Sequence, residues 1–122
     1  MARPYLLVRL RVGEHESPQV PMVVDTGADA CFVDHHLAYT VGVNPTAGGA
    51  LGTVQDLSSE SPTALYPVEL YLPQFDLGFH ADVYFTTLQN SGWNGLLGHK
   101  GFLERFTRVT FYPGDRFELE LP

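Results

Sequence analysis

The chain has 122 residues, 44% hydrophobic and 17% charged, which is the length and composition of one globular domain. Its 14 acidic residues outnumber 7 basic ones, which excludes nucleic acid as a main partner because phosphate binding needs clustered Lys and Arg. The single cysteine, Cys31, excludes a disulfide-built scaffold. There is neither a signal-peptide-like start nor a membrane-spanning apolar run, so we expect a cytoplasmic protein without membrane contact.

The predicted elements of the N-terminal third are mainly strands. Residues 5–12 alternate between apolar and polar and predict a strand, and a polar turn follows over residues 13–18. Residues 20–25 form a nearly all-apolar run, typical of a strand covered on both faces, which ends at the breaker Thr26-Gly27. Residues 34–40 predict one short helix with Asp34 as its N-cap.

The rest of the chain predicts a projecting segment, more strands and a terminal hairpin. Residues 44–63 are glycine-rich and then polar, which indicates a projecting hairpin or loop. The later elements are strands at 64–72 and 78–87, a short helix at 100–106, and a hairpin of strands 108–112 and 116–121. The sequence therefore predicts an all-β domain spanning residues 1–122, with one or two short helices.

One motif carries chemistry: Asp25-Thr26-Gly27 at the end of the apolar run. The tripeptide alone is a weak signal, and its context strengthens it. About 70 residues later the apolar pair Leu96-Leu97 precedes Gly98 and the predicted short helix, and the glycine-rich segment lies between. The alternative interpretation is that Asp25 only starts a turn.

These features together resemble the retropepsin-like aspartic proteases, the single-lobe retroviral proteases and their cellular and bacterial relatives. The resemblance covers nearly the whole chain and is greatest to the small bacterial members. It implies a closed acid-protease barrel that forms half of a two-lobed site, and a flap over residues about 46–63. It also implies an aspartic endopeptidase that acts on peptide or protein substrates without cofactor or metal.

The chemistry of such an enzyme needs two carboxylates. Two carboxylates about 3 Å apart cannot both ionise, so they share one proton and supply both a base for water and an acid for the carbonyl; aspartic proteases are the standard example. The chain has a single Asp-Thr-Gly, so a second copy must supply the other Asp25. We therefore expect a homodimer, tied together by the terminal strands at residues 5–10 and 117–121.

The resemblance also assigns roles around catalytic Asp25. Thr26 would bond across the two-fold axis to the partner's backbone, and Gly27 would leave space for the substrate and accept a bond from its N–H. Ala28 and Asp29 would contact the substrate backbone. From the flap, Gly49, Ala50 and Leu51 would close over the substrate, with Ala50 or Leu51 at the tip.

One departure from the retroviral pattern follows Gly98. Retroviral members have an arginine there that ties to the position of Asp29, whereas this chain has His99-Lys100. Either residue could replace that ion pair only in part, because Arg and Lys differ in bidentate geometry.

Two other residue groups invite different chemistry. Cys31 would need a neighbouring base to act as a nucleophile, and no pattern nominates one. The run Asp34-His35-His36 suggests a metal site, but adjacent side chains point in different directions and the other histidines are scattered. We therefore expect no metal.

Two further functions remain open alongside the endopeptidase. The same fold could serve as a catalytically silent peptide-binding or dimerisation module. An unrelated β-barrel that binds a small ligand would leave the pairing of Leu96-Leu97-Gly98 with Asp25 a coincidence.

Overall fold

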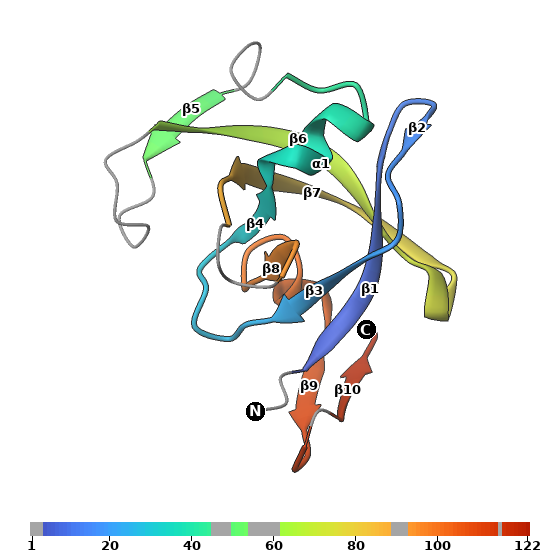
Figure 1. The fold of residues 1–122 in the computed structure, drawn as a ribbon. Coiled ribbons are helices and arrows are strands. Elements are labelled where there is room, and N and C mark those ends of the chain that lie inside the picture. Colours follow the sequence, from blue (N-terminus) through green and yellow to red (C-terminus); the bar gives the residue numbers. More distant parts are fainter. Residues whose placement is uncertain (1–3, 45–49, 54–61, 89–92, 115) are drawn as a thin grey trace.

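A computed structural model describes residues 4–44, 50–53, 62–88, 93–114 and 116–122. Figure 1 shows a β-barrel with one short helix on its surface and a separate two-stranded hairpin at the C-terminus. The barrel strands are β1 (Tyr5–Val12), β3 (Val20–Val24), β4 (Cys31–Asp34), β6 (Pro62–Leu72), β7 (Leu77–Thr86) and β8 (Gly95–Leu97). The other elements are β2 (His15–Glu16), α1 (His35–Thr40), β5 (Ala50–Thr53), η1 (Pro73–Phe75), η2 (Leu103–Arg105), β9 (Arg108–Phe111) and β10 (Phe117–Glu120).

Six strands form a closed ring in the order β1-β3-β8-β4-β7-β6, and pairing of β6 with β1 completes it. Most neighbours are antiparallel, but β3 runs parallel to β8 and β4 runs parallel to β7. Closure leaves no unpaired edge within the ring itself. The fold is therefore an all-β barrel, as the sequence predicts.

Strand β1 shows how the pattern of residues produces the barrel. Its apolar residues Leu6, Val8 and Leu10 are buried, while the residues between them are more exposed. Its first half pairs with β3, and its second half, from Arg9 to Arg11, pairs with β6. One alternating strand thus covers the core and closes the ring at the same time.

The core fills the inside of the barrel and extends beneath η2. Leu10, Met22, Leu70, Leu97 and Phe102 are all fully buried. Phe102 packs beside Phe79 and Phe106, with ring centroids 5.8 Å and 5.1 Å away. Aromatic rings at this spacing add to the free energy gained by burying their area.

Several predicted elements are confirmed and others are corrected. The strands near residues 5, 20, 64 and 78, the terminal hairpin, and the helix with its Asp34 cap are present. The predicted helix over 100–106 is wrong: the segment holds only the 3-10 turn η2, because Gly101 at φ +100° and Phe102 at φ −131° break a helical path. Strands β4 and β8 were not predicted, and β2 lies within the predicted turn.

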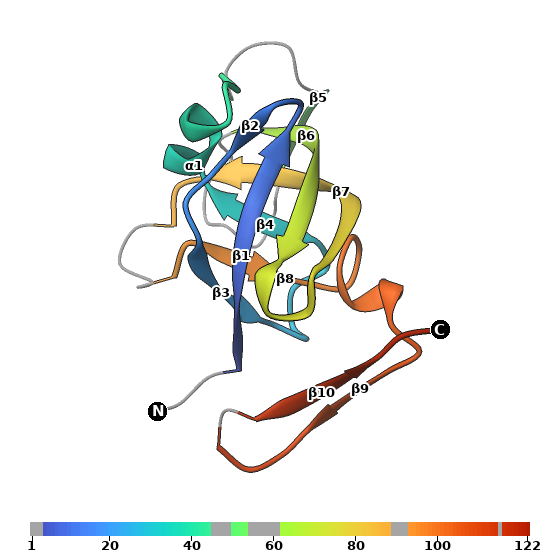
Figure 2. The same cartoon turned by 90° about the vertical axis from the view of Figure 1, so that its right-hand side faces the viewer.

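The terminal hairpin stands apart from the barrel (Figure 2). Strands β9 and β10 pair only with each other in the described residues, from Arg108↔Glu120 to Phe111↔Phe117. Val109, Phe117 and Leu119 are partly buried and pack against the core. Side-chain packing, rather than backbone pairing, therefore attaches the hairpin.

Gly98 lies where two backbone segments meet, and it generates our first prediction. A Cβ at this position would lie 2.5 Å from the carbonyl oxygen of Ala28 and closer still to that of Ala30. Since backbone atoms cannot move aside, Gly98→Ala should lower the free energy of unfolding by about 3 kcal/mol, measured by urea denaturation.

Gly78→Ala is the matched control for Gly98→Ala. Its Cβ would meet the Glu69 carboxylate at 2.6 Å, but that group is the end of a flexible side chain that can rotate away. The control should change stability little. Equal losses for the two variants would contradict the close contact at Gly98.

Candidate functional site

The candidate site is built where β3 ends beside β8. Val23 and Val24 pair with Leu96 and Leu97, and the Asp25 N–H continues this parallel ladder by donating to the Leu97 carbonyl at 3.0 Å. Val23 and Val24 are buried, as expected for a strand covered on both faces. The chain then turns sharply, with the Ala28 N–H donating to the Asp25 carbonyl at 3.1 Å.

The Asp25 carboxylate is held in place by a hydrogen bond within this turn. Its Oδ1 accepts a hydrogen bond from the Gly27 N–H at 2.9 Å. A Cβ on Gly27 would lie 3.2 Å from the same oxygen, so a larger residue would crowd the carboxylate. Asp25 is half-buried, and its Oδ2 has no hydrogen-bond partner among the described residues. One oxygen is thus fixed while the other is free to act.

A second segment, residues 98–100, lies against the turn and forms hydrogen bonds with its backbone. The N–H groups of His99 and Lys100 donate to the carbonyls of Ala28 and Asp29 at 3.0 and 2.9 Å. The His99 side chain also contacts the Thr26 carbonyl through Nε2 at 2.7 Å. Because a carbonyl oxygen only accepts, Nε2 carries the proton in this contact. The side chain that follows Gly98 therefore holds the backbone of the turn.

The predicted site residues differ in how accessible they are in the single chain. Thr26, Gly27 and Asp29 are exposed, so they are available to a substrate or partner. Ala28 is buried, and both of its backbone groups are already bonded. Its carbonyl accepts from the His99 N–H, and its N–H donates to the Asp25 carbonyl. Ala28 therefore has the least to offer to a substrate.

The Asp29 carboxylate makes no ion pair with His99 or Lys100 in the part of the chain that the structure describes. His99 instead points to the Thr26 carbonyl, and Lys100 contributes its backbone. The tie between this segment and the turn is thus made by hydrogen bonds to backbone carbonyls. From the sequence, His99 or Lys100 could have replaced the retroviral ion pair only in part.

The predicted flap is only partly within the described residues. Gly49 and residues 54–61 lie outside them, and 46–63 are represented only by β5 and the start of β6. Ala50 and Leu51 pair with Leu65 and Ala64 inside the β5–β6 ladder. The prediction that one of them forms the tip is therefore wrong, because the ladder continues to Thr53↔Pro62 and the connection comes after it.

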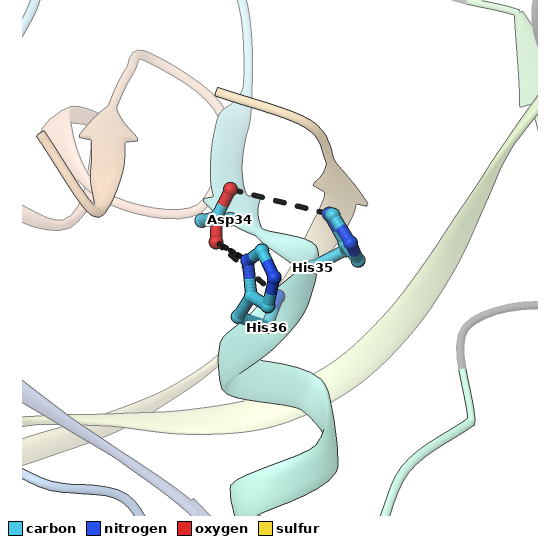
Figure 3. Close-up of side chains that lie close together, drawn as sticks. All are labelled: Asp34, His35 and His36. Atoms are coloured by element: carbon cyan, nitrogen blue, oxygen red, sulfur yellow. Dashed lines mark hydrogen bonds and ion pairs between the residues drawn. The ribbon is translucent and has the colours of Figure 1, made fainter. Parts of the chain in front are cut away.

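Asp34 lies at the start of α1, where its carboxylate contacts the side chains of His35 and His36 (Figure 3). Its Oδ2 accepts from the His36 N–H at 3.3 Å and lies 2.7 Å from His36 Nδ1, and its Oδ1 accepts from the Leu88 N–H at 3.1 Å. Its own N–H donates to the Asn94 carbonyl at 2.9 Å. The carboxylate thereby ties the helix to the start of the connection between β7 and β8, and the Asp34 backbone N–H ties it to the end.

The Asp34, His35 and His36 side chains do converge, contrary to the expectation that adjacent residues point apart. One ligand atom from each lies within 4.8 Å of the others. However, ligands of one zinc ion with bonds of about 2.0 Å lie roughly 3.3 Å apart, and the Asp34–His36 contact is a 2.7 Å hydrogen bond. Both Asp34 oxygens are already occupied by donors, so we assign the group a structural role.

Cys31 is unsuited to nucleophilic chemistry. It is fully buried on β4, and burial raises the pKa of its thiol to about 11. Its Sγ lies 3.6 Å from the Lys100 carbonyl, which gives the S–H an acceptor. The thiol therefore stays protonated near neutral pH and serves as a small core residue.

We compared the chain with protein families and with curated proteins. No protein family matches the chain, and no curated protein matches it either. None of the helices in the described residues is long and apolar enough to cross a membrane.

The cap at Asp34 generates a prediction about stability and pH. Burial opposes ionisation of this carboxyl, but hydrogen bonds from the Leu88 N–H and from the ring and N–H of His36 outweigh it, so the pKa of Asp34 lies below its ordinary value. Asp34→Asn should lower the free energy of unfolding by about 1 kcal/mol at pH 7, measured by urea denaturation.

The pH dependence follows from the sign of that shift. A lowered folded-state pKa contributes stability at pH values above the unfolded pKa and loses it as the pH falls through the folded value. The difference between wild type and Asp34→Asn should therefore shrink below about pH 4. Asp82→Asn, at an exposed carboxylate, is the control and should show little change at either pH. A constant difference down to pH 2 would contradict the role of ionised Asp34.

Proposed function

We propose that the chain is an aspartic endopeptidase of the retropepsin-like kind, in which two Asp25 carboxylates, one from each subunit of a homodimer, activate water. The observation that carries this proposal is the half-buried Asp25 at the end of the parallel β3–β8 pair. One of its oxygens is held by the Gly27 N–H, and the other has no partner among the described residues. An Asp that only starts a turn can also accept the bond from the Gly27 N–H, so the half-buried position of Asp25 at the end of the β3–β8 pair is what favours the catalytic interpretation.

The need for a second subunit follows from the chemistry. The ionised member of the pair takes a proton from water, whose oxygen attacks the carbonyl carbon of the peptide. The protonated member donates its hydrogen to the carbonyl oxygen, which forms a tetrahedral diol. Proton transfer to the nitrogen then lets the C–N bond break, giving a carboxylic acid and an amine. A single Asp25 cannot hold both protonation states at once.

The turn itself supports the pairing of two copies. Thr26 and Gly27 are exposed in the single chain, directly beside the Asp25 carboxylate. A two-fold axis passing between two such turns would bring both carboxylates together, with each Thr26 placed against the partner's backbone. The Gly27 N–H on Oδ1 and the His99 bond to Thr26 would keep each turn rigid as it docks.

The position of the β5–β6 hairpin supports an extended peptide as the substrate. Figure 1 places β5 on the same side of the barrel as the connection between β3 and β4, which carries Asp25. A peptide lying between them would meet Gly27 and Asp29 below and Ala50 and Leu51 above. Covering the scissile bond this way would exclude bulk water and strengthen the polarising hydrogen bonds.

The test is cleavage of a mixed peptide library by wild type and by Asp25→Asn between pH 3 and 7. Asp25→Asn removes the acid–base pair and should lower kcat/KM at least about a hundredfold. Wild-type activity should pass through a maximum within this range, because one carboxylate of the pair must be ionised while the other is protonated.

Two variants serve as controls in the same assay. Glu14→Gln changes an exposed carboxylate in the connection between β1 and β2, and Cys31→Ala removes the only thiol. Both should cleave like wild type. Loss of activity in Cys31→Ala with full activity in Asp25→Asn would overturn the proposal. A wild-type dimer that binds peptides without cutting them would instead identify a silent binding module.

A further inference from the structure

A hollow of about 280 Å³ lies on the barrel wall, beside the segment that follows the Asp25 turn. Five of the residues that line it are small or apolar and at least partly buried, whereas the other four are charged and exposed. The first group is Ala30, Leu65, Ala81, Tyr84 and Gly101, and the second is Asp82, Lys100, Glu104 and Arg105. We call this hollow the Ala30 pocket.

The Ala30 pocket lies next to the place proposed for the substrate. Ala30 directly follows Asp29, whose carbonyl accepts from the Lys100 N–H at 2.9 Å. On the other side of the pocket, Leu65 pairs with Ala50 in the β5–β6 ladder. A peptide between Asp29 and Ala50 would therefore run beside the pocket. Because an extended chain advances about 3.3 Å per residue, the side chain that enters would belong to a residue near the cleaved bond.

The strand register puts one acidic and one basic residue on either side of Ala30. Ala30 forms a parallel bridge with Lys100. Cys31 pairs with Val83, also in parallel, so the preceding residues Ala30 and Asp82 are neighbours as well. The small side chain of Ala30 leaves a hollow between those of Lys100 and Asp82.

Two of the four charged side chains are already bonded within the protein. Glu104 Oε2 accepts from a backbone N–H at 2.6 Å, and the Arg105 guanidinium donates to a backbone carbonyl. By contrast, the side chains of Asp82 and Lys100 form no ion pair in the part of the chain that the structure describes. Asp82 and Lys100 are therefore the two that a ligand can engage.

Charge favours a basic ligand over an acidic one. Two exposed carboxylates without an ion pair among the described residues, Asp29 and Asp82, lie in this region against the one ammonium of Lys100. The whole chain has a formal net charge of −7, so its field attracts cationic peptides and repels anionic ones. A long basic side chain also suits the lining, because its methylene stem can lie on Ala30 and Tyr84 while its charge stays at the exposed rim.

We propose that the Ala30 pocket binds a lysine or arginine side chain of the substrate peptide, with its charge paired to Asp82. The inference rests on the proposed function, because it names the class of peptide that the enzyme would cleave. Asp82 is then a specificity-determining residue, and Lys100 opposes it. A symmetric dimer carries the pocket twice, once on each side of the cleaved bond, so a basic residue on either side is recognised.

The test is cleavage of the mixed peptide library, with the residues around each cut bond read by mass spectrometry. Wild type should favour bonds that have Lys or Arg within about four residues. Asp82→Asn should lower this preference about fivefold because it removes the ion pair. Lys100→Gln should raise the preference because it removes the opposing charge. High salt should weaken the wild-type preference by screening.

Glu14→Gln is the matched control. Glu14 is exposed in the connection between β1 and β2 and does not line the pocket. This variant removes the same charge from the chain as Asp82→Asn, so it separates the pocket from the overall field, and it should keep the wild-type preference. A preference for acidic residues that Lys100→Gln abolishes, or a basic preference that survives Asp82→Asn, would overturn the inference.

Peptide binding separates this inference from the proposed function. Immobilised Asp25→Asn, with and without the second change Asp82→Asn, is used to retain peptides from the same library. If wild type cuts nothing but Asp25→Asn retains basic peptides through Asp82, the pocket stands and the peptidase fails. If wild type cuts bonds without regard to nearby basic residues, the peptidase stands and the assignment of the pocket fails.

Discussion

The parallel pairing of β3 with β8 is the constraint on which the rest of the site depends. It ends with the Asp25 N–H bonded to the Leu97 carbonyl, and this bond sets the point where the chain leaves the barrel and turns. Gly98 then allows residues 98–100 to lie against the carbonyls of Ala28 and Asp29. The hydrogen bonds from residues 98–100 to the turn follow from these two strands lying side by side.

This arrangement holds the Asp25 carboxylate in a defined position on a small barrel. The strand before Asp25 is buried, the backbone after it is held by residues 98–100, and Oδ1 is bonded to Gly27. Rigid strands position a functional group better than a free loop does. The other half of the proposed site lies on a second copy, so function here depends on association as well as on folding.

The sequence predicted the elements that depend on neighbouring residues in the chain. Alternation over residues 5–12 specifies a strand whatever its partner, and Asp34 caps a helix through its own side chain. The short strands β4 and β8 were missed because three or four residues carry no periodic signal, and their pairing depends on residues far away in the chain. The contact of His99 with Thr26 also required the fold, since 73 positions separate them.

The central claim is that one active site is shared by two chains, and subunit mixing tests it most directly. Wild type and Asp25→Asn would be allowed to exchange subunits in equal amounts, and cleavage compared with the same total amount of wild type. Random pairing leaves two intact carboxylates in only a quarter of the dimers, so a shared site predicts activity of about one quarter. Activity of one half would mean that each chain acts with its own Asp25 alone, and would contradict the account.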